Sequence, residues 1–257
     1  MRILVSNDDG IDAPGIRALA AVLSSLGEVV VVAPDRQRSA ASHSISIHHR
    51  LYVDEVSIAI PGAVGYAVSG TPVDCVKWAA VTLGREQPFG LMVSGINEGA
   101  NLATDVLYSG TVAAAGEAAL LGMKAVAFSL IGPEFPFDKA ATVARQIVDR
   151  CISYTWPVDT FLNVNLPPEC ENAPWHVVPL GARGYHNIFH KKVDAEGRTY
   201  YRHAGEAVDD LGDTLTDSQV LQAGGISLTP LTYHFTNESI LGSLKSAFLD
   251  GETAEER

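Results

Sequence analysis

Short apolar runs alternate with helix-length segments through the first 160 residues of the chain. Uninterrupted apolar runs, such as 28–33 and 124–130, are typical of strands that are buried on both faces of a parallel sheet. The expected strands of this half are 2–6, 28–33, 64–69, 91–93 and 124–130. The expected helices are one from Pro14 to about Leu26 with Asp12 as N-cap, one from Pro72 with Thr71 as N-cap, and two at 109–121 and 137–153. Strands that alternate with helices predict an α/β fold with a doubly wound, mostly parallel sheet.

Two stretches depart from this regular alternation. Residues 45–49 and 51–60 alternate between apolar and polar positions, which predicts an inserted antiparallel pair of strands. Residues 181–212 combine glycine, tyrosine, histidine and charged side chains without a helical period, as expected of an extended arm or hairpin. The remaining expected elements are strands at 161–166 and 175–180, a helix at 216–223, a strand at 225–229, a closing helix at 239–249 and a polar, frayed tail at 251–257.

Length and composition narrow the class of protein. With 257 residues, 47% of them hydrophobic, the chain can form one α/β domain, with a core at 1–160 and a C-terminal extension at 161–257. The net charge of −12 argues against a nucleic-acid polymer as partner, because such binding requires a basic surface. No apolar run is long enough to cross a membrane or to serve as a signal peptide, so no membrane partner is expected. Cys75, Cys151 and Cys170 match no zinc-binding spacing and are expected to be reduced, buried thiols of a cytoplasmic protein.

Oxygen-bearing side chains follow three of the expected strands. Asp8 and Asp9 come directly after the first strand, Ser39 lies in the loop after the second, and Asn97 lies in the loop after 91–93. The carboxyl ends of parallel strands meet at one edge of the sheet, where ligands bind. Two adjacent carboxylates repel each other unless a cation lies between them, and carboxylate, hydroxyl and amide oxygens suit a hard divalent metal. The alternative for each segment alone is an ordinary turn or polar loop.

A second group of residues predicts an anion site at the same edge. Ser109, Gly110 and Thr111 open an alanine-rich helix, whose free backbone amides and hydroxyls can receive a phosphate. Asn101 can donate its side-chain amide to the same phosphate. Taken singly, the start of this helix favours a plain N-cap over an anion site. The chain has no GxGxxG after its first strand, no GxxxxGK[ST] loop and no DxDxT pattern, which argues against a dinucleotide site, a P-loop and an aspartyl-phosphate phosphatase.

Together these segments resemble the stationary-phase survival protein (SurE) family of metal-dependent nucleotidases. The motifs that carry the resemblance occur in order and are Val5-Ser6-Asn7-Asp8-Asp9-Gly10, Arg38-Ser39, Ser69-Gly70-Thr71-Pro72-Val73-Asp74-Cys75-Val76, Ser94-Gly95-Ile96-Asn97-Glu98-Gly99-Ala100-Asn101, Tyr108-Ser109-Gly110-Thr111-Val112 and Ile226-Ser227-Leu228-Thr229-Pro230-Leu231. The resemblance spans nearly the whole chain. One departure is Ala40, where a glycine is expected and where alanine should stiffen the loop.

The resemblance implies a Rossmann-like fold whose C-terminal β-rich extension joins subunits into a homodimer or homotetramer. It also implies hydrolysis of nucleoside monophosphates to nucleoside and inorganic phosphate, with short-chain polyphosphate as a further substrate. By the same resemblance, one divalent cation per subunit, Mg²⁺ or Mn²⁺ with Ca²⁺ as an alternative, is held by Asp8, Asp9, Ser39 and Asn97. Phosphate contacts fall on Asn97, Asn101, Ser109, Gly110 and Thr111, and the catalytic residues are Asp8 and Asp9.

Two mechanisms and two other function classes stay open at this point. In one mechanism Asp8 or Asp9 orients an attacking water activated by the metal, and in the other Asp8 attacks phosphorus directly. The other classes are a non-catalytic nucleotide or phosphate sensor and a metal-dependent sugar-nucleotide enzyme. The second class requires another Rossmann-like domain, for which 161–257 is too short and irregular. The histidines His43, His48, His49 and His234 are expected to be surface or core residues rather than catalytic ones.

Overall fold

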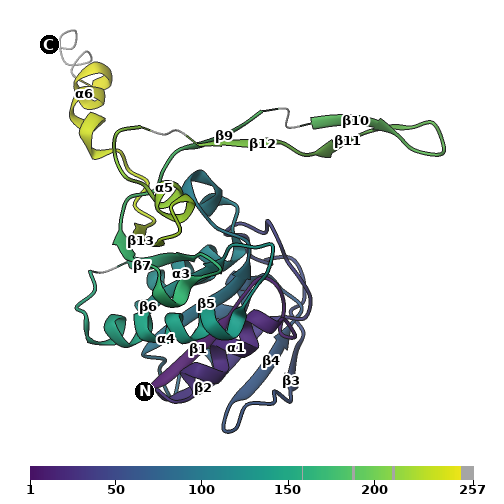
Figure 1. The fold of residues 1–257 in the computed structure, drawn as a ribbon, viewed down its shortest axis with the longest axis vertical. Helices are drawn as coiled ribbons and strands as arrows, with labels where there is room; N and C mark the ends of the chain where they lie inside the picture. The colour runs from purple at the N-terminus through teal and green to yellow at the C-terminus, as the bar shows by residue number, and fades with distance from the viewer. Residues whose placement is uncertain (158, 187–188, 210–211, 250–257) are drawn as a thin grey trace, which may run out of the picture.

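A mixed sheet of nine strands, in the order β3-β4-β2-β1-β5-β6-β7-β13-β8, forms the centre of the computed structural model (Figure 1). The structure describes residues 1–157, 159–186, 189–209 and 212–249. The strands of this sheet are β1 (Arg2–Ser6), β2 (Glu28–Pro34), β3 (Val53–Val56), β4 (Val64–Val68), β5 (Leu91–Glu98), β6 (Lys124–Leu130), β7 (Thr160–Leu166), β8 (Trp175–Val177) and β13 (Ile226–Thr232). The helices are α1 (Pro14–Leu23), α2 (Pro72–Trp78), α3 (Gly110–Leu120), α4 (Phe137–Ser153), α5 (Asp217–Gln222) and α6 (Glu238–Leu249), with short π and 3-10 segments at Ala79–Leu83, Ala103–Leu107 and Cys170–Asn172.

The inner strands of the sheet run parallel to one another. β4, β2, β1, β5, β6 and β7 pair in parallel, and helices connect most of them in the chain. β3 and β13 are the antiparallel members, pairing with β4 and β7. The predicted doubly wound α/β fold is therefore confirmed, because the apolar runs that predicted it are the strands covered by helices on both faces.

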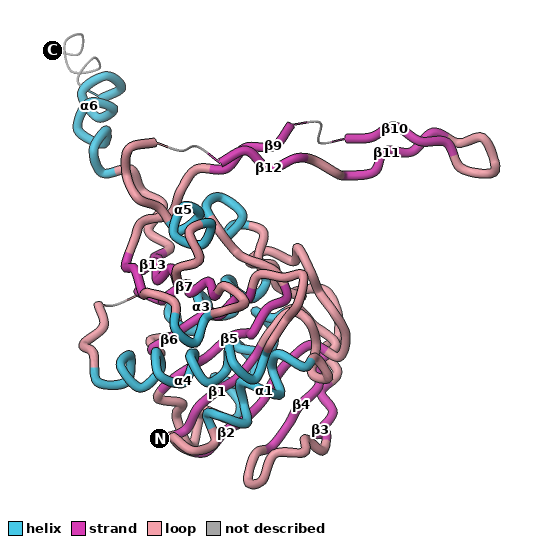
Figure 2. Tube along the Cα trace, viewed as in Figure 1, coloured by secondary structure: helices cyan, strands magenta, loops and turns pink. Residues whose placement is uncertain are grey.

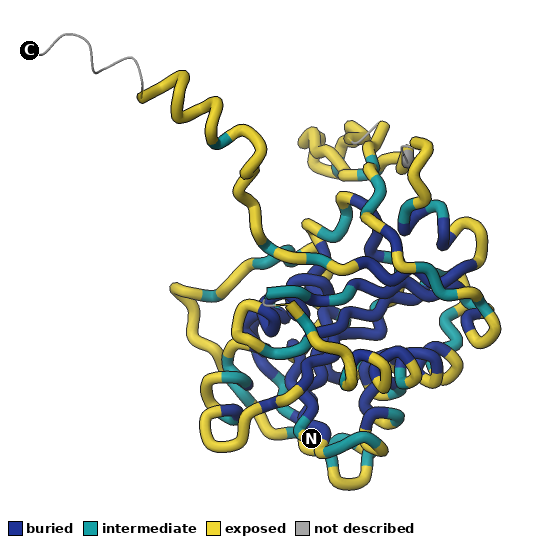
Figure 3. Tube along the Cα trace, turned by 90° about the vertical axis from the view of Figure 1, so that its left-hand side faces the viewer, coloured by how far each residue is buried: buried dark blue, intermediate teal, exposed yellow. Residues whose placement is uncertain are grey.

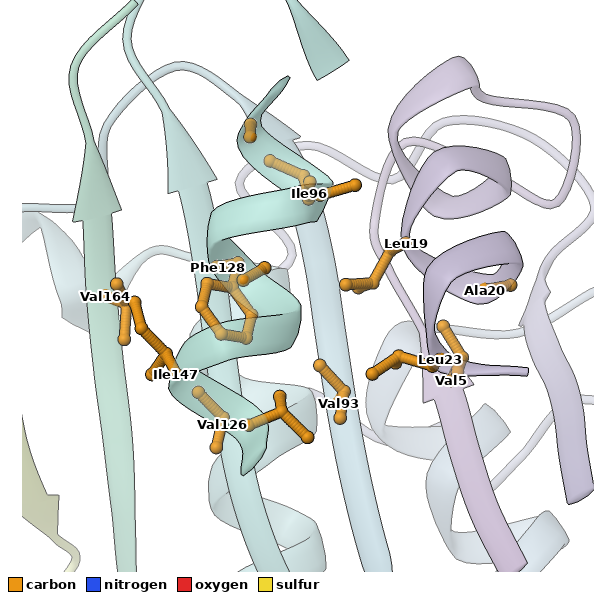
Figure 4. Close-up of a cluster of buried hydrophobic side chains, with 14 of the residues drawn as sticks. Val5, Leu19, Ala20, Leu23, Val93, Ile96, Val126, Phe128, Ile147 and Val164 are labelled. Carbon is orange, nitrogen blue, oxygen red and sulfur yellow. The ribbon is translucent and has the colours of Figure 1, made fainter. Parts of the chain in front are cut away.

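Two hydrophobic cores fill the space between the sheet and its helices. On one face, Val5, Val93 and Phe128 pack against Leu19 of α1 and Ile147 of α4 (Figure 4). Each such fully buried side chain contributes about 1.5 to 3 kcal/mol to stability. On the other face α2 and α3 cover the sheet, and the alanine-rich sequence of α3 is buried from Gly110 to Ala119. Small side chains let α3 approach the sheet closely, which brings its first turn next to the end of β1.

Three predicted boundaries are wrong. α1 begins at Pro14 after Ala13 as N-cap and ends at Leu23, while Asp12 pairs with Arg17 instead of capping the helix. Residues 45–49 form no strand, and β3 pairs with β4 rather than with them. The strand predicted at 91–93 continues to Glu98, with a register shift against β6 between Ser94 and Asn97. In each case tertiary pairing decided a boundary that local pattern leaves undetermined.

The second half of the chain adds to the sheet and then leaves it. β7, β13 and β8 extend the sheet formed by the strands of the first half. The predicted arm consists of two antiparallel pairs, β9 (Arg183–His186) with β12 (Glu206–Asp209) and β10 (Phe189–Val193) with β11 (Thr199–His203). The arm and α6 project from the body (Figures 1 and 2). The tail at 251–257 lies outside the described residues.

The three cysteines are unpaired and buried, as predicted for reduced thiols. Within the described residues, no helix combines the length and apolar character needed to cross a membrane.

Candidate active site

Residues from five separate segments line one cavity of about 290 Å³ at the carboxyl edge of the sheet. The lining residues are Asp8, Asp9, Gln37, Ser39, Ala40, Asn97, Glu98, Asn101, Asp105, Tyr108, Ser109 and Tyr185. Six of the eight predicted site residues are thus in its wall. Thr111 lies beside it and donates a hydrogen bond from Oγ1 to Oδ1 of Asp8, and Gly110 lies against the same side chain. The structure therefore brings all the sequence-predicted site residues together.

The turn after β1 is fixed by its own side chains. Asn7 donates from Nδ2 to the Gly10 carbonyl at 2.9 Å and accepts from the Gly10 amide at 3.1 Å. Gly10 has a φ of +102°, a conformation in which a side chain is strained. The amide of Arg38 donates to the carbonyl of Asp8 at 2.7 Å, which ties the loop after β2 to the same turn. Sequence and backbone geometry together hold Asp8 and Asp9 at the strand end.

Asp8 is a buried carboxyl group, with 5% of its surface exposed. The pKa of Asp8 is raised from its ordinary value of 3.8 to about 6, because burial, with the neighbouring charge of Asp9, outweighs the lowering effect of the Thr111 hydrogen bond. An ionised Asp8 is therefore unfavourable unless positive charge is brought to it.

Asp9 is more exposed and is held by partners that the sequence did not reveal. Gln37 donates from Nε2 to Oδ1 of Asp9, and the amide of Glu98 donates to its Oδ2, both at 3.3 Å. Burial also raises the pKa of Asp9. Gln37 was missed because nothing in the local pattern of its loop shows that it faces β1.

The start of α3 approaches Asp8 more closely than any side chain would allow. Ser109 is the N-cap of α3 and accepts from the amide of Val112 at 3.1 Å, as predicted for a capping serine. A Cβ placed on Gly110 would lie 2.8 Å from Cβ of Asp8 and 3.0 Å from its Oδ2. The glycine is therefore required by contact, and the positive end of α3 lies beside the carboxylates.

Asn101 is held by a buried network of polar groups from β6 and β7. Its amide donates to Oδ1 of Asn165 at 2.8 Å, and its carbonyl accepts from Asn163 and Asn165 at 2.9 and 3.0 Å. Its side-chain Nδ2 donates to Oγ of Ser129 at 2.7 Å, which uses one of the two amide hydrogens. The donation to phosphate predicted for Asn101 therefore has one hydrogen available.

Asn163 and Asn165 were missed by sequence reasoning although a signal was present. Both are fully buried on β7, a strand otherwise composed of apolar residues and threonine. Two asparagines at alternate positions of a buried strand require partners, because an unsatisfied buried amide costs free energy. That pattern indicates a polar network, although it does not show which residue the network holds.

Ser39 lies exposed in a loop that is fixed at both ends. Ala40 has a φ of +55°, so it occupies the left-handed conformation in which glycine is favoured. This position is the one where the sequence departs from the family pattern. Farther along the loop, the amide and hydroxyl of Ser42 donate to the carbonyls of Tyr108 and Leu107.

His43 also helps to anchor this loop. Its Nε2 lies 2.8 Å from Oε2 of the buried Glu117 on α3, and Lys77 bonds the other oxygen of that carboxylate. The hydrogen bond with His43, together with Lys77, lowers the pKa of Glu117 despite its burial. His43 is thus a structural residue, as predicted. His48 and His49 do not lie on a strand, and His234 pairs at 3.4 Å with Asp159.

The residues around the cavity fit a hard divalent cation. The wall carries four carboxylic acids, and among the described residues its lining contains no lysine, arginine or histidine. Among the described residues no group of three or more His, Cys, Asp and Glu side chains is placed to hold a metal. Two carboxylates with hydroxyl, amide and water oxygens match the coordination of Mg²⁺, which uses few protein carboxylates and keeps several waters. Asn97 uses its amide nitrogen on the Gly99 carbonyl at 2.7 Å, which leaves its oxygen for such an ion.

Larger hollows elsewhere have a different character. One of about 730 Å³ lies between α1, the loop after β3 and the start of α4, and one of about 720 Å³ lies between α4 and the strands β8 and β13. Their walls are mostly apolar. The smaller cavity at the sheet edge combines four carboxylic acids with the N-terminus of α3, so we assign the candidate site to it.

Comparison with known proteins links this geometry to a family. The family described as Survival protein SurE matches residues 3–187. The chain is 46% identical over 245 residues to a 5′-nucleotidase SurE of Heliobacterium modesticaldum, covering 94% of this chain and 89% of that protein. It is 43% identical over 255 residues to a 5′-nucleotidase SurE of Carboxydothermus hydrogenoformans, covering 96% of each. The crystal structure of the SurE protein from Aquifex aeolicus superposes with a TM-score of 0.84 at 36% identity, covering 96% of this chain and 99% of that one.

Proposed function

The chain belongs to the survival protein SurE family, and from that premise we propose that it is a metal-dependent phosphohydrolase that converts nucleoside 5′-monophosphates to nucleoside and inorganic phosphate. The observation that carries the proposal is the position of Asp8 and Asp9 beside the N-terminus of α3. A cation between the carboxylates and an anion at the helix start are complementary, and a phosphate monoester is the ligand that uses both.

Asp8, Asp9, Ser39 and Asn97 would hold the cation, one ion per subunit. Mg²⁺ or Mn²⁺ suits this all-oxygen donor set, and Ca²⁺ is the alternative. When bound, a divalent cation neutralises phosphoryl oxygens and makes hydroxide available near neutral pH. The raised pKa of Asp8 supports this assignment, because it reflects a buried carboxyl group that lacks a positive partner.

The remaining residues of the site bind and orient the phosphoryl group. The hydroxyl of Ser109 and the backbone amides at the start of α3 are placed to receive its equatorial oxygens, together with the second amide hydrogen of Asn101. Donors fixed in advance stabilise developing charge without reorganising during the reaction.

Asp9 is the better candidate for the group that orients an attacking water. It is the more exposed carboxylate of the pair. Asp8 is constrained by Thr111 and by contact with Gly110, which supports a role as ligand rather than as nucleophile. Isolation of a chain phosphorylated on Asp8 would contradict this account.

We also propose a homodimer or homotetramer assembled through the C-terminal half. The helix α6 has no buried residue (Figure 3). Ile240, Leu244 and Phe248 are exposed on it at a spacing of four, which places them on one stripe of the helix. The arm likewise exposes Phe189 and Tyr201. Exposed apolar stripes of this kind are typical of surfaces that another chain covers.

The rival classes receive less support. The described residues after 160 extend the existing sheet and form the arm, and they form no second Rossmann-like domain of the kind that a sugar-nucleotide enzyme requires. Hydrolysis of short-chain polyphosphate stays a prediction that the cavity does not favour. In the part of the chain that the structure describes, its lining carries four carboxylic acids and no lysine or arginine to bind additional phosphates.

The proposal is tested by phosphate release from nucleoside 5′- and 3′-monophosphates and short-chain polyphosphate, with Mg²⁺ or Mn²⁺ and with a chelator. Metal-dependent release from the 5′-monophosphates is expected, and it should be lost in Asp8→Asn. Asp12→Asn is the matched control, since Asp12 is an exposed aspartate outside the cavity wall. If the folded, metal-loaded protein binds nucleotide but releases no phosphate, the proposed enzymatic function is contradicted and a nucleotide sensor is favoured.

A further inference from the structure

We propose that Tyr108 and Tyr185 form a nucleobase subsite at the rim of the candidate active site. The inference rests on the proposed function and deepens it, because it names the part of the substrate that the cavity recognises beyond the phosphate. Nothing in the local sequence pattern places these two tyrosines together, since they are separated by most of α3, β6, α4 and β7.

Both tyrosines are exposed aromatic side chains in the wall of an otherwise polar cavity. Tyr108 is 62% exposed and Tyr185 is 40% exposed, and both line the cavity that contains Asp8 and Ser109. They are its only aromatic lining residues within the described part of the chain. A flat, uncharged aromatic ring is the ligand that gains from such a surface, because every nucleobase has a face that stacks on an aromatic side chain.

The ring of Tyr185 is held in place by the body of the protein. Its hydroxyl lies 2.7 Å from both carboxylate oxygens of Asp105, to which it donates, and Arg183 bonds the same carboxylate at 2.8 Å. Thr104 donates from Oγ1 to the carbonyl of Arg183 at 2.8 Å. The base of the arm is thereby docked on the 3-10 segment Ala103–Leu107. A ring fixed before binding loses little conformational entropy when a ligand stacks on it.

Tyr108 connects this rim directly to the phosphate site. Its amide donates to the carbonyl of Asp105 at 2.9 Å, and its own carbonyl accepts from Ser42 at 3.1 Å. The next residue, Ser109, is the N-cap of α3. Tyr108 and the anion site are therefore parts of one continuous segment, and Tyr185 reaches the same cavity from the arm. A ligand with a phosphate at one end and a base at the other requires such an arrangement.

The charge of the cavity agrees with a nucleoside beyond the first phosphate. Glu98 and Asp105 add two carboxylic acids to Asp8 and Asp9 in the lining. A metal at Asp8 and Asp9 would offset one phosphate, whereas further phosphates toward the rim would meet the carboxylate of Glu98, and that of Asp105, whose charge Arg183 offsets. A neutral base over the tyrosines carries no such cost.

The test compares adenosine 5′-monophosphate with ribose 5-phosphate, which carries the phosphate and sugar but no base. Tyr108→Ala and Tyr185→Ala are each expected to raise KM for the nucleotide about tenfold while leaving kcat and the hydrolysis of ribose 5-phosphate close to the wild-type values. Tyr185→Phe keeps the ring but loses the hydrogen bond to Asp105, so its KM should rise less than that of Tyr185→Ala. Tyr52→Ala is the matched control, because Tyr52 is also 62% exposed and lies outside this cavity.

Equal losses of activity toward both substrates in the alanine variants would contradict the proposed subsite. An unchanged KM for the nucleotide would contradict it as well. A chain that releases phosphate from neither compound contradicts the proposed function instead. In that case equilibrium binding of the nucleotide, with ribose 5-phosphate as competitor, is compared among the same variants. The subsite again requires a selective loss of nucleotide affinity in the two alanine variants.

Discussion

At the scale of single residues, Asp8 is the side chain whose surroundings least favour its own charge. It is buried next to a second carboxyl group, and its pKa is raised to about 6. The folded chain without metal therefore binds a proton at Asp8 more tightly than the unfolded chain does. The contribution of this proton to the free energy of unfolding is fully present below about pH 3.8, and it is lost as the pH rises to about 6 and above.

Asp8→Asn is therefore expected to stabilise the metal-free protein at neutral pH. The shift from 3.8 to about 6 corresponds to a gain on the order of 3 kcal/mol above the folded pKa, and to little gain near the unfolded value. The measurement is urea denaturation with chelator at about pH 4 and about pH 7.5 for both chains. Identical pH dependence in the two would show that Asp8 is not a buried, destabilised carboxyl group.

Gly110 is the second residue with a sharp consequence. Gly110→Ala places a methyl group 2.8 Å from Cβ of Asp8, so the first turn of α3 and the carboxylate must move apart. A displacement of about 1 Å at a reacting centre lowers the rate roughly 100-fold, so phosphate release should fall by that order while the fold is retained. Gly242→Ala, where the added methyl group meets nothing within 4 Å, is the control. Unchanged activity in Gly110→Ala would show that the close approach of Gly110 to Asp8 is not needed for phosphate release.

At the scale of elements, β7 stabilises the loop after β5, to which it is not connected directly in the chain. Asn165 bonds both the amide and the carbonyl of Asn101, so a buried strand fixes the residue at the end of the loop after β5. The same strand forms part of the core through Val164 and Leu166. The strand β7 therefore contributes both to the stability of the fold and to the position of a proposed substrate-binding residue.

Asn165→Ala is expected to weaken phosphate binding as well as folding. It leaves the two backbone groups of Asn101 without this partner, which costs about 1 to 3 kcal/mol in stability. The inhibition constant of inorganic phosphate should rise, because Asn165 no longer holds the backbone of Asn101 that positions its side-chain amide. A variant with reduced stability and an unchanged inhibition constant would make Asn165 structural only. Asn172→Ala, at an exposed asparagine, is the control.

The elements also show what a sequence can and cannot predict. Asp8 and Asp9 follow β1, Asn97 lies at the carboxyl end of β5, and Ser109 precedes the first residue of α3. Position at the sheet edge follows from such placement alone. The partners Gln37, Asn163 and Asn165 depend on which strands are neighbours and on their register. Tyr185 depends on how the arm docks. Such relations are set by tertiary pairing, so local periodicity does not contain them.

At the scale of the whole molecule, the candidate site lies at one edge of the sheet, and α6 and the arm expose apolar side chains. The cavity draws on segments after β1, β2 and β5, the start of α3 and the base of the arm. α6 and the arm extend from the body (Figure 1). The proposed assembly and the proposed site therefore share the arm, whose base contributes Tyr185.

The central claim is that Asp8 and Asp9 hold one cation on which hydrolysis depends. The most direct measurement titrates Mn²⁺ into the chelated protein and records bound metal and phosphate release from adenosine 5′-monophosphate in the same samples. The account predicts one ion per chain, with activity proportional to occupancy, and loss of both in Asp8→Asn but not in Asp12→Asn. Full activity in the metal-free chain, or tight stoichiometric binding that Asp8→Asn leaves unchanged, would contradict it.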